Sequence, residues 1–527
     1  MIRRLVLCWL LLCSSCAAFA LTPEQARGIA VGDGDERIAA LNRAAGEGAE
    51  GLEAFVQALL ADEVKVAGEA VFIVQGDKAV DAASGAPATL PADADDVVNN
   101  NRVRGALQAA LASLHLFSPD VAVRRAAVTE LMGQSLDESQ LVLLDKAVAA
   151  ESDAALKDSL ARMRAAILVA SPDKARRLEA IAELARSGQG AVASLLQERL
   201  APDAELDAQV RAALAGALAE VKSRLAWGER LGVLFTGASL GSILLLAALG
   251  LAITYGLMGV INMAHGELLM IGAYATYVVQ NLFRQYLPGA FDWYIAAAIP
   301  ASFLAAALVG AAMERSVIRW LYGRPLETLL ATWGISLVLM QAVRSFFGAQ
   351  NVPVENPAWL SGGVAVMGNL TLPWNRIAII AFAALVLAAV ALLIARTRLG
   401  LFVRGVTQNR RMAACVGVDT ARVDTLAFAL GAGLAGLGGC ALSQVGNVGP
   451  DLGQGYIVDS FLVVVLGGVG QLAGTVYAAL GLGVLNKFLE GWAGAVLAKI
   501  MVLVFIVVFI QKRPQGIFAM KGRSAEA

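Results

Sequence analysis

The chain has 527 residues, of which 58% are hydrophobic and only 16% are charged. Soluble domains carry about 25% charged residues, so this composition excludes a wholly soluble protein. Residues 21–230 hold 32 acidic and 22 basic side chains, whereas residues 231–527 hold 11 acidic and 18 basic ones. We therefore predict an acidic soluble half followed by a basic, apolar membrane half.

The chain starts with a secretory signal pattern, MIRRLVLCWLLLCSSCAAFALT. Two arginines precede an apolar core, and A-F-A at 18–20 is a typical cleavage site, so we predict a signal peptide over residues 1–20. An uncleaved anchor and a lipoprotein are the alternatives. The lipoprotein is disfavoured because Cys13, and not an aliphatic residue, stands three positions before Cys16.

Cysteines are scarce after this segment. Cleavage would leave only Cys415 and Cys440, and the chain has two histidines in all. The exported half would then fold without disulfides. No cluster of cysteines or histidines predicts a metal site.

Residues 21–226 are predicted to form a mostly helical exported domain. Ser-Pro-Asp precedes helical apolar spacing at residue 118 and again at 171, and Ala-Pro-Asp at 201 begins a looser copy. Serine caps helices, proline suits the first helical position and aspartate suits the positive helix end. The copies suggest a HEAT-like layer, but spacings of 53 and 30 residues do not make a regular repeat.

One segment of this domain, VFIVQG at 71–76, predicts a short strand. We see no nucleophile, catalytic base or phosphate loop in the domain. We therefore interpret it as an interaction or scaffold domain.

Residues 227–527 are predicted to form an all-α, polytopic membrane domain of about eight spans. A span needs about 20 apolar residues, and apolar segments lie at 231–257, 264–283, 293–313, 327–347, 376–395, 422–443, 456–487 and 495–511. Basic residues gather at 315–324, 396–411 and 512–523. By the positive-inside rule these stretches and the C-terminus are cytoplasmic, and the N-terminal domain is outside.

The segment at 456–487 carries three glycines between positions 467 and 470. The predicted sidedness requires an even number of crossings, or incomplete ones, between residues 446 and 493. We therefore predict two short or re-entrant helices joined at these glycines. Irregular backbone in a membrane is stable only where protein or a water-filled cavity covers it. The break is either a wall of a pathway or a kink in a packing helix.

Five glycines fall between residues 431 and 439. Small residues let membrane helices approach closely. We therefore expect close helix packing around this segment.

The loop TRLGLFVRGVTQNRRMAACVGVD, residues 397–419, is long and basic and carries a short amphipathic helix that ends at a glycine. Taken alone, it is either a solvated loop that obeys the positive-inside rule or a segment that couples to an inner partner.

Six stretches of the membrane half resemble, in order, the permeases of branched-chain amino-acid ABC importers. In chain order they are NMAHGELLMIGAY (262–274), GRPLETLLATWGISLVL (323–339), the loop at 397–419, GAGLAGLGGCAL (431–442), VLGGVGQLAGTVYAALGLG (465–483) and QKRPQGIF (511–518). Within that family, the secreted extension and ALSQVGNVGPDLGQGYIVDSFLVVVLGGVG (441–470) resemble the permeases of urea importers.

This resemblance implies a non-enzymatic permease subunit in a bacterial inner membrane that serves nitrogen uptake. The implied solute is urea, and a branched-chain amino acid or short amide is the alternative. The implied partners are ATPase subunits, a second homologous permease, a periplasmic solute-binding protein and the lipid bilayer, but no nucleic acid. The chain lacks the G-x-x-x-x-G-K-[ST] phosphate loop, so ATP would be used by the partner and this chain would need no cofactor.

The resemblance also implies residue roles. It assigns the ATPase-coupling helix to Asn409, Arg410, Arg411, Met412, Ala413, Ala414 and Gly417.

Two other classes of protein remain as alternatives to a permease subunit. A membrane sensor would be expected to have few spans and an inner signalling domain, and a passive urea channel would need no coupling loop.

His265 and Glu267 are ionisable residues in an otherwise apolar stretch. An acid at the middle of a membrane helix costs about 2.5–3.5 kcal/mol. Either these residues begin the second span, bonded to backbone at the positive helix end, or they line a translocation path. Amides and hydroxyls suit the N–H donors and carbonyl of urea. The path candidates are Asn262, His265, Glu267, Tyr255, Gln444, Asn447, Ser460 and Asn486.

Overall fold

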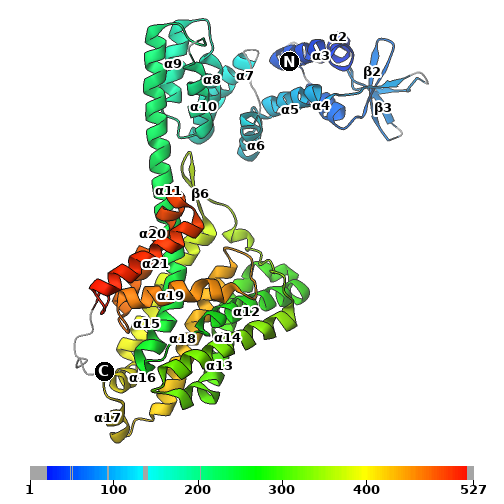
Figure 1. Cartoon of the computed structure of the whole chain (residues 1–527). Helices are drawn as coiled ribbons and strands as arrows, with labels where there is room; N and C mark the ends of the chain where they lie inside the picture. Colours follow the sequence, from blue (N-terminus) through cyan, green and yellow to red (C-terminus); the bar gives the residue numbers. More distant parts are fainter. Residues whose placement is uncertain are drawn as a thin grey trace, which may run out of the picture. The chain divides into compact units, whose positions relative to one another are not determined.

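The computed structural model of the chain describes residues 21–518, except positions 48, 50, 77, 92–93, 134–139 and 202 and the side chain of Leu257. The predicted signal peptide and the end of the basic tail, with Lys521 and Arg523, lie outside the described residues. Helices dominate the described part (Figure 1), and this confirms the predicted fold class. Contacts divide the chain into two compact units, one ending at Leu225 and the other beginning at Ala226.

The described part of the first unit, from residue 21, opens with four helices and a small sheet that share one apolar core. The helices are α2 (Pro23–Ala30), α3 (Gly34–Glu47), α4 (Leu52–Leu60) and α5 (Asn101–His115). The strands are β1 (Val64–Ala67), β2 (Ala70–Gln75), β3 (Lys78–Asp81), β4 (Pro87–Ala88) and β5 (Asp95–Asp96), in the antiparallel order β4-β3-β2-β1-β5.

The strand predicted at 71–76 is confirmed as β2, but the sheet around it was not predicted. A tight turn places Ala67 opposite Ala70, with Gly68 at a φ of +60°. Glycine adopts this left-handed conformation without steric cost. The other strands are short and carry little apolar alternation, which is why sequence patterns did not reveal them.

The other described residues of the first unit form a pair of three-helix repeats. The first holds α6 (Val121–Met132), α7 (Leu141–Ala150) and α8 (Ala154–Leu168), and the second holds α9 (Lys174–Leu184), α10 (Gly190–Arg199) and the start of α11 (Ala208–Met258). The predicted serine caps are wrong: Asp120 and Asp173 cap α6 and α9, accepting from backbone N–H groups at 2.8 and 2.9 Å. Aspartate is a better cap than serine here because its negative carboxylate also interacts favourably with the positive helix end.

In each repeat, one arginine joins the segment before the first helix to a glutamate just before the third helix. Arg124 donates to the Ser118 carbonyl and forms an ion pair with Glu151, and Arg177 donates to the Ser171 carbonyl and pairs with Glu205. These two arginines are 53 residues apart. The looser copy predicted at 201 is therefore not a third repeat, because it corresponds to the Glu-x-Asp stretch before α8.

The Glu151 carboxylate predicts a pH dependence of this unit. It accepts from the Arg124 guanidinium at 2.8 and 3.0 Å and from two backbone N–H groups. The Arg124 hydrogen bond lowers its pKa from 4.5 to about 2. A lowered carboxylate pKa stabilises the folded state above pH 4.5, and this stability is lost as the pH falls toward 2.

We expect amide-exchange protection of α8 in the full chain, corrected for intrinsic rates, to fall by about tenfold between pH 6 and pH 3. Glu151→Gln should lower protection at pH 6 and flatten the pH dependence. The matched control is Glu198→Gln at an exposed position of α10, which should change neither. An unchanged pH profile in Glu151→Gln would refute this assignment.

The second unit contains all eight predicted apolar segments as helices. They are α11, α12 (His265–Tyr286), α13 (Tyr294–Ser316), α14 (Pro325–Phe347), α15 (Trp374–Arg396), α18 (Thr420–Ser443), the pair α19 (Leu452–Gly467) and α20 (Leu472–Ala493), and α21 (Ala495–Lys512). Seven of the described helices are long and apolar enough to cross a membrane. The two others are α12, which is less apolar, and α19, which is shorter.

The connections between these helices carry short elements. They are the 3-10 turns η2 (Pro288–Trp293), η3 (Ile318–Leu321) and η4 (Ala358–Leu360), the hairpin β6 (Gly363–Met367) with β7 (Leu370–Pro373), and the helices α16 (Arg398–Gln408) and α17 (Arg410–Cys415).

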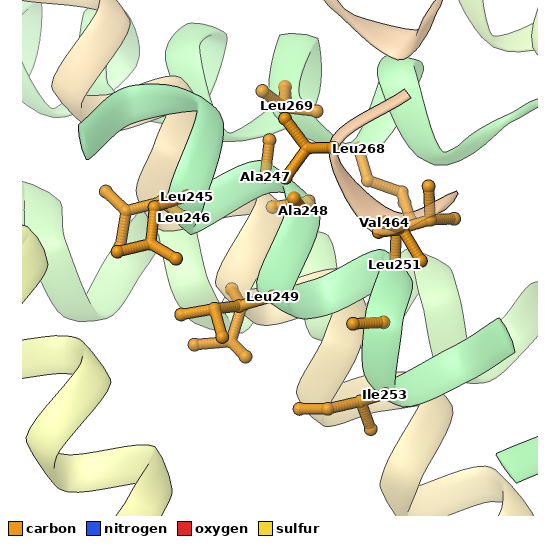
Figure 2. Close-up of a cluster of buried hydrophobic side chains, with 14 of the residues drawn as sticks. Leu245, Leu246, Ala247, Ala248, Leu249, Leu251, Ile253, Leu268, Leu269 and Val464 are labelled. Atoms are coloured by element: carbon orange, nitrogen blue, oxygen red, sulfur yellow. The ribbon is translucent and has the colours of Figure 1, made fainter. Parts of the chain in front are cut away.

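α18 lies in the core of the second unit, and its glycines pack against neighbouring backbones. Of its most apolar 18-residue window, 83% is buried. A Cβ on Gly436 would meet the Ala306 Cβ at 2.7 Å, and one on Gly439 would meet the Ala273 nitrogen at 2.8 Å. The predicted close packing around residues 431–439 is confirmed. Figure 2 shows the adjoining apolar cluster, in which Leu268 and Leu269 lie beside Ala247 and Ala248 of α11.

The predicted break at 467–470 is also confirmed. α19 ends at Gly467, Gly468 and Gly470 have φ values of +97° and +76°, and α20 begins at Leu472. One expectation is corrected, because α20 has 22 residues and is not a short helix. The Ile517 N–H donates to the Leu466 carbonyl at 2.8 Å, so the basic tail packs against this break.

Candidate functional site

Three path candidates lie at the start of α12: His265 and Glu267 in its first turn and Asn262 just before it. α12 begins at His265, and the Asn262 side chain accepts from the Ala264 N–H at 3.0 Å. The His265 Nε2 donates to the Ala247 carbonyl of α11 at 2.9 Å. All three candidates, Asn262, His265 and Glu267, are at most 1% exposed. The helix-start interpretation is therefore correct as far as position is concerned.

That interpretation does not account for every polar atom. The Glu267 Oε1 accepts from the Ser336 hydroxyl of α14 at 2.9 Å, while its Oε2 has no protein partner. The Asn262 Nδ2 and the His265 Nδ1 are also buried without a partner. Buried polar atoms are nearly always hydrogen-bonded, so atoms left open in a membrane helix are suited to water or a polar solute.

Two buried side chains of α12 and α14, Tyr274 and Ser336, were not predicted as site residues. The backbone of Gly266 packs against that of Gly453 in the first turn of α19, which follows Asp451. The Tyr274 hydroxyl is buried and has no protein partner. No local pattern marks Tyr274 or Ser336, because their relevance depends on how α12, α14 and α19 pack.

The other path candidates lie elsewhere or have structural contacts. Gln444 bonds the Tyr294 hydroxyl and the Ser443 hydroxyl at 3.1 Å each, which ties the end of α18 to the start of α13. Asn447 is exposed. Asn486 lines a small cavity with Asp459, and Tyr255 packs against Phe461 with ring centres 6.4 Å apart. Ser460 is fully buried, and its hydroxyl has no protein partner.

The segment at 397–419 forms two helices where one was predicted. Asn409 ends α16 and caps α17, its side chain accepting from the Met412 N–H at 2.9 Å. Gly417 follows α17 with a φ of +89°, so a glycine ends the segment as predicted. Between α16 and α17 lies an open groove of about 420 Å³, lined by Leu401, Phe402, Met412 and Val416 among others.

The residues assigned to the coupling helix differ in where they lie. Arg411, Met412 and Ala414 are exposed, whereas Ala413 is buried. Arg410 forms an ion pair with the fully buried Asp424 of α18, and its guanidinium carbon lies 4.9 Å from the centre of the Tyr322 ring. Burial, with the nearby Asp424 and Glu314 carboxylates, raises the pKa of Tyr322.

The second unit is similar in sequence to known proteins. Residues 233–510 match the family model described as branched-chain amino acid transport system, permease component. The chain is 29% identical over 288 residues to the high-affinity branched-chain amino acid transport system permease protein BraD of Pseudomonas aeruginosa, covering 54% of this chain and 94% of BraD. It is 28% identical over 295 residues to LivH of Escherichia coli K12, covering 54% of this chain and 94% of LivH. No solved structure matches.

Proposed function

The chain belongs to the family of permease components of branched-chain amino-acid transport systems, and on that premise we propose that it is the membrane-spanning subunit of an ATP-driven importer in a bacterial inner membrane. The observation that carries the proposal is the match over residues 233–510, which extends from α11 to α21. Membership of this family implies ATPase subunits and a solute-binding protein as partners. We also propose that a second permease subunit is a partner and that this chain itself needs no cofactor.

The proposed orientation places the N-terminal unit in the periplasm and the C-terminus in the cytoplasm. The basic loops at 315–324 and 396–411 and the basic tail would then lie on the inner side, as the positive-inside rule expects. The exposed segment at 397–419 would meet the ATPase, with the groove between α16 and α17 as an apolar contact surface.

The proposed solute is a branched-chain amino acid, because the permeases that match this chain are named for that transport. Urea is the second candidate. It rests on the resemblance of the N-terminal extension and residues 441–470 to the permeases of urea importers. A buried carboxylate with a free oxygen, Glu267, suits the ammonium group of an amino acid and also the N–H groups of urea.

The experiment that tests this proposal is uptake of labelled leucine and labelled urea in cells that lack the chain, then in cells that carry it again. Loss and recovery of leucine uptake alone would support the main proposal. Loss and recovery of urea uptake alone would select the second solute. Unchanged uptake of both would contradict the proposed solutes, and uptake that survives ATP depletion would favour a passive channel.

Replacing Glu267 tests the proposed path. We expect Glu267→Gln to lower uptake at least about tenfold, because an amide removes the charge that would meet a substrate N–H group. The control is Ser336→Ala, which removes the hydroxyl bonded to the Glu267 Oε1 and should leave most of the uptake. Wild-type uptake by a well-expressed Glu267→Gln variant would remove Glu267 from the path.

Cys415 tests the orientation and the docking surface together. It is exposed at the end of α17, whereas Cys440 is buried in α18. We expect a membrane-impermeant maleimide to label Cys415 in inside-out vesicles but not in intact cells, and bound ATPase to protect it. Cys415→Ser supplies the background. Labelling from outside intact cells would invert the proposed orientation.

A further inference from the structure

Six side chains join α17 to the helices of the second unit, and none of the roles proposed so far uses them as a group. They come from the end of α13, from η3 and the residue after it, from the start of α17 and from α18. We call this set the hub: Glu314, Arg319, Tyr322, Arg410, Asp424 and Thr425.

Glu314 is the centre of one side of the hub. It is fully buried and its Oε2 accepts from the Thr425 hydroxyl at 2.6 Å and from the Arg319 Nη2 at 3.4 Å. Its Oε1 accepts from the Tyr322 hydroxyl at 3.1 Å. These contacts fasten the end of α13 to α18 and to the turn after α13.

Arg410 is the centre of the other side. It is the first residue of α17, and both its terminal nitrogens donate to the Asp424 carboxylate. Its guanidinium stacks over the Tyr322 ring. The Tyr322 hydroxyl also lies 3.1 Å from the Met258 sulfur at the end of α11. Asp424 and Thr425 are neighbours on α18, so the two sides are continuous.

The charges in the hub are balanced and difficult to separate. Glu314 and Asp424 are fully buried carboxylates, and Arg319 and Arg410 supply two positive charges, with side chains 37% and 42% exposed. Removing the positive partner of a buried carboxylate strongly destabilises the folded protein. A fully bonded polar network therefore holds one arrangement, so α17 cannot leave α18 without uncovering Asp424.

We propose that Arg410 is a positioning residue, through which the hub passes movements of α17 to α11, α13 and α18. In this account the ATPase contacts exposed residues of α17, while the Arg410 guanidinium pairs with the buried Asp424 and carries the movement inward. This inference rests on the proposed function, because it needs an ATPase that moves α17.

The test is reconstitution of the chain with its ATPase and binding-protein partners in vesicles, with uptake and ATP hydrolysis measured together. We expect Arg410→Ala and Asp424→Asn to keep ATP hydrolysis and subunit association but to lower uptake per ATP about tenfold. The double variant should be no worse than either single one, because both remove the same link. Arg410→Lys keeps the charge but not the two-pronged bond, so it should fold and still lose part of the coupling.

The chain offers a matched control in Arg422, which pairs with Asp419 at the start of α18 with side chains 83% and 53% exposed. Arg422→Ala removes an exposed pair within one turn of Asp424 and should leave uptake per ATP unchanged. Two results would overturn the inference: unchanged uptake per ATP in Arg410→Ala, or loss of the ATPase from that variant's complex, which would make Arg410 a contact residue. Failure of the wild-type complex to show ATP-dependent uptake would instead contradict the proposed function.

Discussion

Gly436→Leu is expected to prevent the chain from accumulating as a folded membrane protein. Gly436 lies where α12, α13 and α18 meet: its own Cβ would meet the Ser302 carbonyl and Ala306, and a Cβ on Gly272 would meet Gly436 itself. Backbone cannot yield as a flexible side chain can, so we expect a loss of more than about 3 kcal/mol. The measurement is the thermal midpoint and the yield of detergent-purified protein.

The matched control for this prediction is Gly481→Leu. Gly481 lies on α20, is exposed, and a Cβ there would meet nothing within 4 Å. It should purify with a midpoint close to that of the wild type. If Gly436→Leu melted at the same temperature as Gly481→Leu, the close packing described for α18 would be wrong.

Met412→Glu combined with Val416→Glu is expected to abolish association with the ATPase. These side chains are 60% and 73% exposed and line the groove between α16 and α17. Burying two carboxylates against an apolar partner surface should weaken binding by at least about tenfold, since central contacts contribute ~2 kcal/mol or more each. Co-purification of the ATPase with the tagged chain measures this directly.

The control here keeps the surface apolar. Met412→Leu with Val416→Ile changes shape but not polarity and should retain the ATPase. Full co-purification with the double glutamate variant would show that the ATPase docks elsewhere, and the coupling role proposed for residues 409–417 would then fail. Loss of the ATPase from both double variants would point to shape and not polarity as the deciding property.

Sequence patterns predicted the membrane unit well because its strongest signals are local. Apolar length predicted the helices, and the glycines at 467–470 predicted the division between α19 and α20, because positive φ values there favour glycine. The glycines of α18 predicted close packing for a similarly local reason, since a missing side chain is visible in the sequence.

Features that depend on distant contacts were missed. Arg410 and Arg411 are adjacent, chemically identical and both exposed, yet it is Arg410 that pairs with Asp424. The difference arises from helix phase and from the packing of α17 on α18. The sheet around β2 was missed for another reason, because strands of two to four residues carry too little periodicity.

The candidate site was partly predictable. His265 and Glu267 stood out because ionisable residues are rare in apolar stretches, and both lie in the first turn of α12. Ser336 and Tyr274 are ordinary residues for a membrane helix, and only the packing of α12 and α14 brings Ser336 to Glu267. Gln444 and Asn447 were chosen for their chemistry alone, and the first bonds Tyr294 while the second is exposed.

The central claim is that this chain moves a solute only when an ATPase partner works. The most direct test is uptake of labelled leucine and labelled urea by right-side-out vesicles from cells that carry the chain, supplied with periplasmic extract and loaded with ATP or a non-hydrolysable analogue. The account predicts uptake with ATP, none with the analogue, and none in vesicles that lack the chain. Equal uptake with ATP and with the analogue would contradict it.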